Sequence, residues 1–120
     1  MLRFKETFVQ RETNSAQLNA GVKLYFDSIT EAKKHGNLPH NAFVVANQDT
    51  TCTIYIWLDS DEESEQPDFI LYPNQVIAVN AEEGVQFQTL IIKNTHASSN
   101  IAANKIKLRY STAKVIEDKK

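Results

Sequence analysis

The side chains that could carry out acid–base, nucleophilic or metal chemistry are present in this chain but are not spaced for it. The three histidines, His35, His40 and His96, are far apart, and none belongs to an H-x-H or H-E-x-x-H pair. Such pairs gather the ligands of a catalytic metal ion. The fingerprints of serine hydrolases, P-loop proteins and dinucleotide-binding proteins are missing as well. We therefore expect no catalytic residue, no metal ligand and no cofactor, and predict that the protein is not an enzyme.

Carboxylates are concentrated between residues 59 and 68, which we call the acidic segment. Its acidic residues are Asp59, Asp61, Glu62, Glu63, Glu65 and Asp68. A calcium loop of the EF-hand type needs a glycine at its sharp turn, and none occurs in this segment. A solvated loop is therefore favoured over an ion site.

The remaining composition argues against several classes of partner. The net charge is −2, and no stretch approaches the roughly 20 apolar residues of a membrane span. We expect neither nucleic acid nor membrane as a partner, and no small-molecule ligand. The single cysteine, Cys52, cannot form an internal disulfide, and its place on the apolar side of a strand predicts a buried thiol in a protein made in reducing cytosol.

Two sets of side chains are candidates for contacts with a partner. Lys105, Lys107 and Arg109 alternate with apolar residues, either to discourage unwanted strand pairing or to attract the acidic segment of a neighbouring copy. Tyr55 and Trp57 lie opposite the apolar face of the segment from Cys52 to Leu58. Two large aromatic side chains are rarely left facing water, so we expect another molecule or another part of the chain to cover them. A partner subunit is preferred, and the N-terminal segment or a sugar ring is the alternative.

The elements that position these residues are short β-strands. Alternation of apolar and polar residues predicts strands at 22–26, 42–46, 52–58, 69–72, 75–79, 85–92 and 103–110, with a change of phase near residues 88–89. A capping box at Ser28 and Glu31 predicts one short helix at Ile29 to His35. The fold class is all-β, an antiparallel, jelly-roll-like β-sandwich with one short helix and an N-terminal arm.

The domain organisation is predicted to be simple. Residues 1–20 form the arm, 21–112 the sandwich and 113–120 a charged tail. Arg3, Lys5 and Arg11 alternate with Phe4, Phe8 and Val9, which gives the arm charge and apolar anchors for docking on a neighbour. An added edge strand from Phe4 to Val9 is the alternative to a docking arm.

Several of these strands carry a resemblance to a known group of proteins. The segments at 43–47, 54–58, 69–75, 90–94 and 106–110 resemble the small jelly-roll virion proteins of tailed bacteriophages, which are capsid decoration (cement) proteins and auxiliary head proteins. The resemblance implies a subunit, often trimeric, that is made in the host cytoplasm, binds the major capsid protein on the outer surface of the head and stabilises the shell. The alternative is a carbohydrate-binding or receptor-binding module of a phage fibre or tail, with Tyr55 and Trp57 as stacking platforms.

Overall fold

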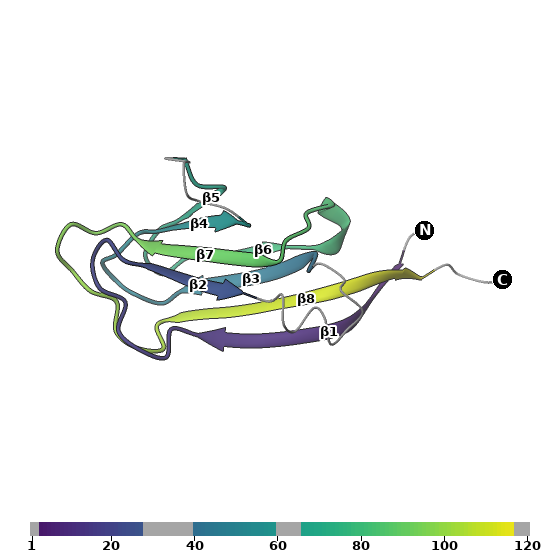
Figure 1. Cartoon of the computed structure of the whole chain (residues 1–120), viewed down its shortest axis with the longest axis horizontal. Helices are drawn as coiled ribbons and strands as arrows, with labels where there is room; N and C mark the ends of the chain where they lie inside the picture. The colour runs from purple at the N-terminus through teal and green to yellow at the C-terminus, as the bar shows by residue number, and fades with distance from the viewer. Residues whose placement is uncertain (1–2, 28–39, 60–65, 117–120) are drawn as a thin grey trace.

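The protein is a sandwich of two four-stranded antiparallel sheets (Figure 1). The computed structural model describes residues 3–27, 40–59 and 66–116. The strands are β1 (Arg3–Thr13), β2 (Lys23–Asp27), β3 (Ala42–Asn47), β4 (Ile54–Leu58), β5 (Phe69–Leu71), β6 (Val76–Val79), β7 (Thr89–Asn94) and β8 (Ile106–Ile116), with a 3₁₀ helix, η1 (Ala81–Glu83), after β6. The predicted all-β sandwich is confirmed. The helix predicted at Ile29 to His35 lies outside the described residues.

The order of the strands is that of a jelly roll. Sheet I has the order β1-β8-β3-β6, and sheet II has the order β2-β7-β4-β5. The chain changes sheet at each connection between strands except the one from β4 to β5. Eight strands arranged in this way form the double-sheet fold found in viral capsid proteins, lectins and cupins.

The core lies between the sheets and is built from the alternation seen in the sequence. Phe43 and Val45 of β3 face Ile54 and Ile56 of β4, and all four are buried. The other core residues include Leu90, Ile92, Ile106, Leu108 and Tyr110. Burying each such side chain stabilises the fold by roughly 1.5–3 kcal/mol. Each sheet therefore has one inner face that belongs to the core and one outer face that points away from it.

The N-terminal segment is an edge strand and not a separate arm. β1 pairs with β8 from Arg3 opposite Ile116 to Thr13 opposite Lys107, with a register shift between Glu6 and Phe8. The alternative prediction, an added edge strand, is therefore what the structure contains. The strand is longer than the predicted range Phe4 to Val9. β8 also continues to Ile116, beyond the boundary predicted at residue 112.

The segment after β1 is fixed to the rest of the chain by Asn14 and Leu18. The Asn14 amide donates to Ala102 O at 2.9 Å, and its Oδ1 accepts from Ile106 N at 2.9 Å. Leu18 is buried and exchanges two backbone hydrogen bonds with Ile101. These polar and apolar anchors tie the segment to its own chain, so it is part of the sandwich, and its docking on a neighbour stays a prediction.

The change of phase near residues 88–89 marks the start of a strand. Phe87 pairs with His40 in an isolated bridge, whereas β7 begins at Thr89. Asp59 Oδ1 accepts from the amides of Gln88 and Thr89 at 2.7 and 3.2 Å. Residues 85–87 and β7 are therefore two separately anchored segments, which is why their apolar side chains follow different phases.

Candidate functional site

The two described histidines, His40 and His96, make hydrogen bonds within the fold. No three His, Cys, Asp or Glu side chains among the described residues are grouped so as to hold a metal ion. His40 Nδ1 lies 3.0 Å from Thr112 Oγ1, and His96 Nδ1 accepts from the amides of Ser98 and Ser99. In the same part of the chain, no helix has the length and apolar character needed to cross a membrane.

Cys52 is buried, as predicted. Its Sγ lies 3.5 Å from Ser99 O. Burial, together with the neighbouring Asp49, raises the pKa of the Cys52 thiol to about 11. Because the thiolate is the nucleophilic form, this cysteine is inert at neutral pH.

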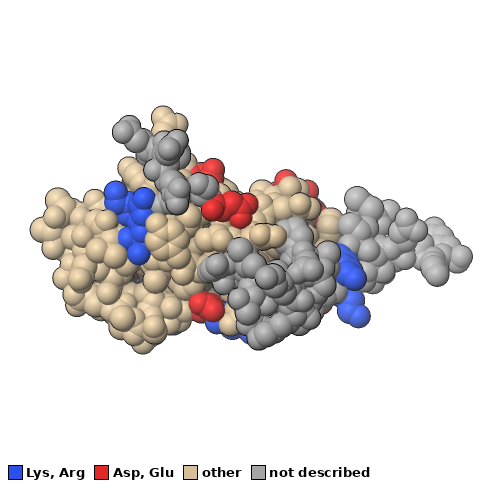
Figure 2. Space-filling view, in the orientation of Figure 1, with Lys and Arg blue, Asp and Glu red and all other residues tan. Residues whose placement is uncertain are grey.

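The outer face of sheet II carries a group of aromatic and aliphatic side chains, which we call the aromatic face. It comprises Lys23, Tyr25, Tyr55, Trp57, Ile70, Ile91 and Lys93, which are neighbours across β2, β7, β4 and β5. Tyr25 is 55% exposed and Ile70 is 45% exposed. Figure 2 shows basic side chains gathered over β2 and β7, where Lys23 and Lys93 pair. This face therefore combines exposed apolar area with positive charge.

Trp57 lies within the aromatic face but is covered in the single chain. Only 4% of it is exposed. The Lys23 ammonium lies 5.5 Å from the centre of its ring, and Tyr55 meets it edge to face at 5.9 Å. The prediction that Trp57 contacts a partner directly is corrected, because its ring is already removed from water. Tyr55 is half-buried and keeps part of its surface for a contact.

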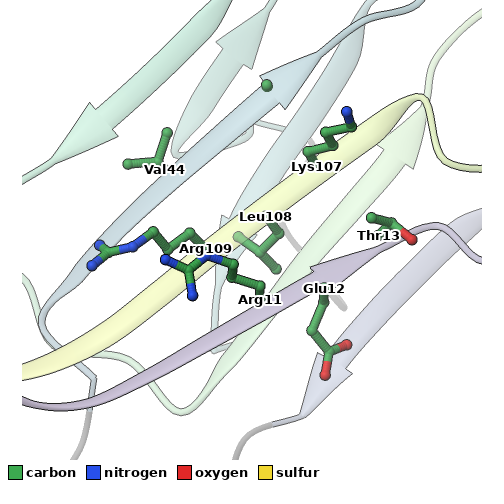
Figure 3. A pocket seen from close by; sticks show the side chains of 8 residues that line it. Arg11, Glu12, Thr13, Val44, Lys107, Leu108 and Arg109 are labelled. Atoms are coloured by element: carbon green, nitrogen blue, oxygen red, sulfur yellow. The ribbon is translucent and has the colours of Figure 1, made fainter.

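The outer face of sheet I is hollowed by a groove of about 440 Å³, which we call the cationic groove (Figure 3). The groove is lined by Arg11, Glu12 and Thr13 of β1, Val44 and Ala46 of β3, and Lys107, Leu108 and Arg109 of β8. It lies where Arg11 and Val44 both pair with Arg109 in the ladder. Small side chains of β3 form the floor, and long basic side chains of β1 and β8 form the wall.

The charges in the cationic groove are unequally balanced. Arg109 Nη2 lies 2.6 Å from Glu6 Oε2, so this guanidinium has a partner. Figure 3 shows Arg11 reaching from β1 toward Arg109, whereas the Glu12 carboxylate lies on the other side of β1. Neither Arg11 nor Lys107 makes an ion pair with any described residue. The groove therefore presents an excess of positive charge.

The structure divides the predicted contact residues between two surfaces. Tyr55 and Trp57 lie on the outer face of sheet II, and Lys107 and Arg109 lie on that of sheet I. Lys105 is exposed just before β8 and does not line the groove. A single interface cannot use both sets in one flat contact.

The predicted contact residues of the N-terminal segment are all in β1. Phe4 lines a smaller hollow of about 230 Å³, with Ala42 and Ala113, farther along sheet I. The side chains of Arg3 and Phe8 lie outside the described part of the structure.

The sequence did not identify Tyr25 or Ile70 as contact residues, and it gave Arg11 as a charge of the arm and not as a neighbour of Arg109. The period of two in Val9, Arg11 and Thr13 could have identified the face of β1 that carries Arg11. Ile70 stands in a run of three apolar residues, where alternation gives no indication of the exposed side.

Comparison of the chain with protein-family models, curated proteins and solved structures finds no match.

Proposed function

We propose that this protein is a structural virion protein, a decoration or cement protein that binds the outer surface of a phage head and stabilises the shell. The observation that carries the proposal is the aromatic face, an apolar surface with Tyr25, Ile70 and the half-buried Tyr55 on a rigid sheet. Exposed apolar patches of this kind serve as protein contacts. The jelly roll, shared with capsid proteins, supports the proposal as an analogy of fold.

The proposed partners are the major capsid protein and further copies of this chain, as a trimer. An exposed tyrosine gives a contact a large apolar area and a hydroxyl that can stay hydrated at the rim. A contact built on two or three such side chains is modest for one copy, but linked copies on a symmetric shell add to one another through avidity. The proposed location is the capsid surface, after synthesis in the host cytoplasm.

Co-sedimentation of the full chain with empty capsids tests this proposal. The double variant Tyr25→Ser with Ile70→Ser removes apolar area that is already exposed, so the fold should persist. We expect its capsid binding to fall by at least about tenfold, since contact residues of this type each contribute 1 kcal/mol or more at the centre of an interface. The matched control is Val76→Ser on sheet I, which removes a side chain that is 64% exposed. Equal binding by both variants and the unaltered chain would refute the proposal.

A carbohydrate-binding module is the second candidate, favoured by Tyr25 and Tyr72, each 55% exposed. A flat aromatic ring can stack on a sugar, and lectins use the same fold. Trp57 cannot serve as the platform because it is buried. Glycan-array binding that Tyr25→Ala or Tyr72→Ala abolishes, with no binding to capsids, would establish this second function in place of the first.

A further inference from the structure

We propose that the cationic groove of one copy binds the acidic segment of a second copy, so that copies join head to tail. The inference names the contact through which the self-association proposed above would occur, and it rests on that proposal. It concerns a surface of sheet I, whereas the contact proposed above uses the outer face of sheet II.

The first support is an electrostatic strain within the groove. Arg11 and Arg109 stand directly opposite each other in the β1–β8 ladder. Like charges in this position destabilise a sheet. Glu6 compensates Arg109, and no described residue compensates Arg11 or Lys107. An anionic group placed over these side chains would relieve the repulsion and gain charge-assisted hydrogen bonds.

The second support is the shape of the groove. Val44 and Ala46 form its floor, and the small alanine lets another backbone approach the sheet closely. A volume of about 440 Å³ admits a short stretch of chain with its side chains spread over the rim. The shape of the groove is therefore suited to an extended acidic peptide as its occupant, and less suited to the flat face of another protein.

The third support is the complementary charge elsewhere in the chain. The acidic segment contains six carboxylates within ten residues. Asp59 is already used to accept from Gln88 and Thr89, and Asp68 Oδ2 accepts from Leu58 N at 2.8 Å. Those two residues hold the ends of the segment to sheet II. Four further carboxylates, Asp61, Glu62, Glu63 and Glu65, come between them in the sequence.

The segment cannot occupy the groove of its own chain. β3 runs toward the end of the sandwich that holds Ala46 and the groove, and β4 runs back to the opposite end, where Asp59 follows it. The groove is also on the outer face of the other sheet, beyond a core about 10 Å thick. Eight residues leaving and rejoining one sheet between Asp59 and Asp68 extend outward by only about 14 Å, at roughly 3.5 Å per residue in each direction, which is too short to pass around the edge of the sandwich to the outer face of sheet I. The occupant must therefore belong to another copy.

A contact between two different surfaces of one subunit has a defined consequence for assembly. Such a heterologous contact closes into a ring when the rotation between copies allows it and otherwise continues as an open chain. Two copies can satisfy it only by exchanging both contacts about a two-fold axis. The proposed trimer is the smallest ring in which each copy meets two different neighbours.

The test is the mass of the purified full chain in solution, measured by sedimentation at 50 mM and at 500 mM salt. We expect assemblies larger than a dimer at low salt that dissociate at high salt, because exposed ion pairs are screened. Arg11→Glu with Lys107→Glu, and separately Glu62→Lys with Glu63→Lys, should each weaken association by at least about tenfold. The matched control is Lys114→Glu, which reverses an exposed charge on β8 outside the groove.

The decisive variant combines both reversals in one chain. It should associate again, since the groove and the segment are then complementary with exchanged signs. Loss of association that the combined variant does not restore would overturn the proposal, and so would a protein that stays monomeric at low salt. Binding of a short duplex DNA by the groove, lost in Arg11→Glu, would assign the groove to nucleic acid instead. Capsid binding that survives in the groove variants would show that the proposed function does not depend on the head-to-tail contact, so a failure of one is distinguished from a failure of the other.

Discussion

Tyr55 and Trp57 share one face of β4 and touch each other, yet they have different surroundings. Trp57 is almost completely covered, whereas Tyr55 is half-buried. Trp57 Nε1 is buried and has no hydrogen-bond partner among the described residues. An unpaired buried N–H lowers stability by about 1–3 kcal/mol, and the stabilisation from burying the apolar area of the indole must exceed this cost. Trp57 therefore contributes to folding and not to a partner contact.

Replacing Trp57 by alanine should lower the free energy of unfolding by about 3–5 kcal/mol, because the change opens a cavity under the aromatic face. Urea unfolding followed by circular dichroism measures this loss, and the loss should not depend on protein concentration. Tyr25→Ala on the same face is the control, and its effect on the monomer should be below about 0.5 kcal/mol. A Trp57→Ala effect that disappears on dilution would place the indole at an interface between copies.

Asp49 accepts hydrogen bonds from two amides of the loop between β3 and β4, and its carboxyl makes the stability of the fold depend on pH. Burial alone would raise the pKa of this carboxyl, but hydrogen bonds from the amides of Cys52 and Thr51, at 2.6 and 2.8 Å, hold it below its ordinary value of 3.8. The folded state therefore favours the carboxylate. Its contribution is fully present above the unfolded pKa and is lost as the pH falls through the folded value.

The variant Asp49→Asn should be less stable than the original chain at pH 7 by about 1 kcal/mol, because an uncharged acceptor replaces the charged one. The difference between the two proteins should shrink as the pH falls below about 4. Urea unfolding at pH 7 and pH 3 measures both values. A difference that stays constant over this range would contradict a role for the Asp49 charge.

At the scale of elements, β1 is the strand whose role was least evident in the sequence. Its alternation is interrupted at the register shift between Glu6 and Phe8, so no single period covers the whole strand. Its partner β8 lies about a hundred residues away in the chain. β3, with strict alternation over one buried face, was predicted at 42–46 and spans Ala42–Asn47, whereas β8 was predicted at 103–110 and spans Ile106–Ile116.

The order of the strands and the separation of the two candidate surfaces could not be read from the sequence. Both depend on which strands pair, and alternation reports only which side of a strand is buried. Lys107 and Arg109 were identified because they alternate on β8, whereas Arg11 joins them only through the pairing of β1 with β8.

Deletion of residues 1–13 tests the role of β1. We expect the shortened chain to lose most of its stability, because the deletion leaves one side of β8 unpaired and uncovers its inward side chains. Thermal unfolding, followed by circular dichroism in the β-sheet band, gives the stability of the shortened chain, and light scattering shows whether it aggregates. A truncated protein with an unchanged melting transition would show that the segment is dispensable for the fold.

At the scale of the whole molecule, the two surfaces should respond differently to salt. The cationic groove acts through exposed charges, which are screened beyond about 10 Å at 0.1 M salt and beyond about 3 Å at 1 M salt. The exposed side chains Tyr25 and Ile70 act through apolar area, which salt does not weaken.

Raising the salt from 0.05 to 0.5 M should therefore dissociate the soluble assemblies while capsid binding by the aromatic face persists. Sedimentation of the protein alone and co-sedimentation with capsids, under the same two conditions, give the comparison. Capsid binding that is lost in step with self-association would indicate that both depend on charge.

The central position of β8 in sheet I also constrains the order in which the protein can fold during synthesis. β8 lies between β1 and β3, and the ribosome makes it after all the other strands described here. Until it emerges, β1 has no neighbour and the pair of β3 and β6 has an open edge. Sheet I must therefore form late, when β8 pairs with β1 on one side and with β3 on the other. Such long-range pairing is slow. A nascent chain that stalls before Ile106 exposes the inward side chains of β3, including Phe43 and Val45, to other stalled chains.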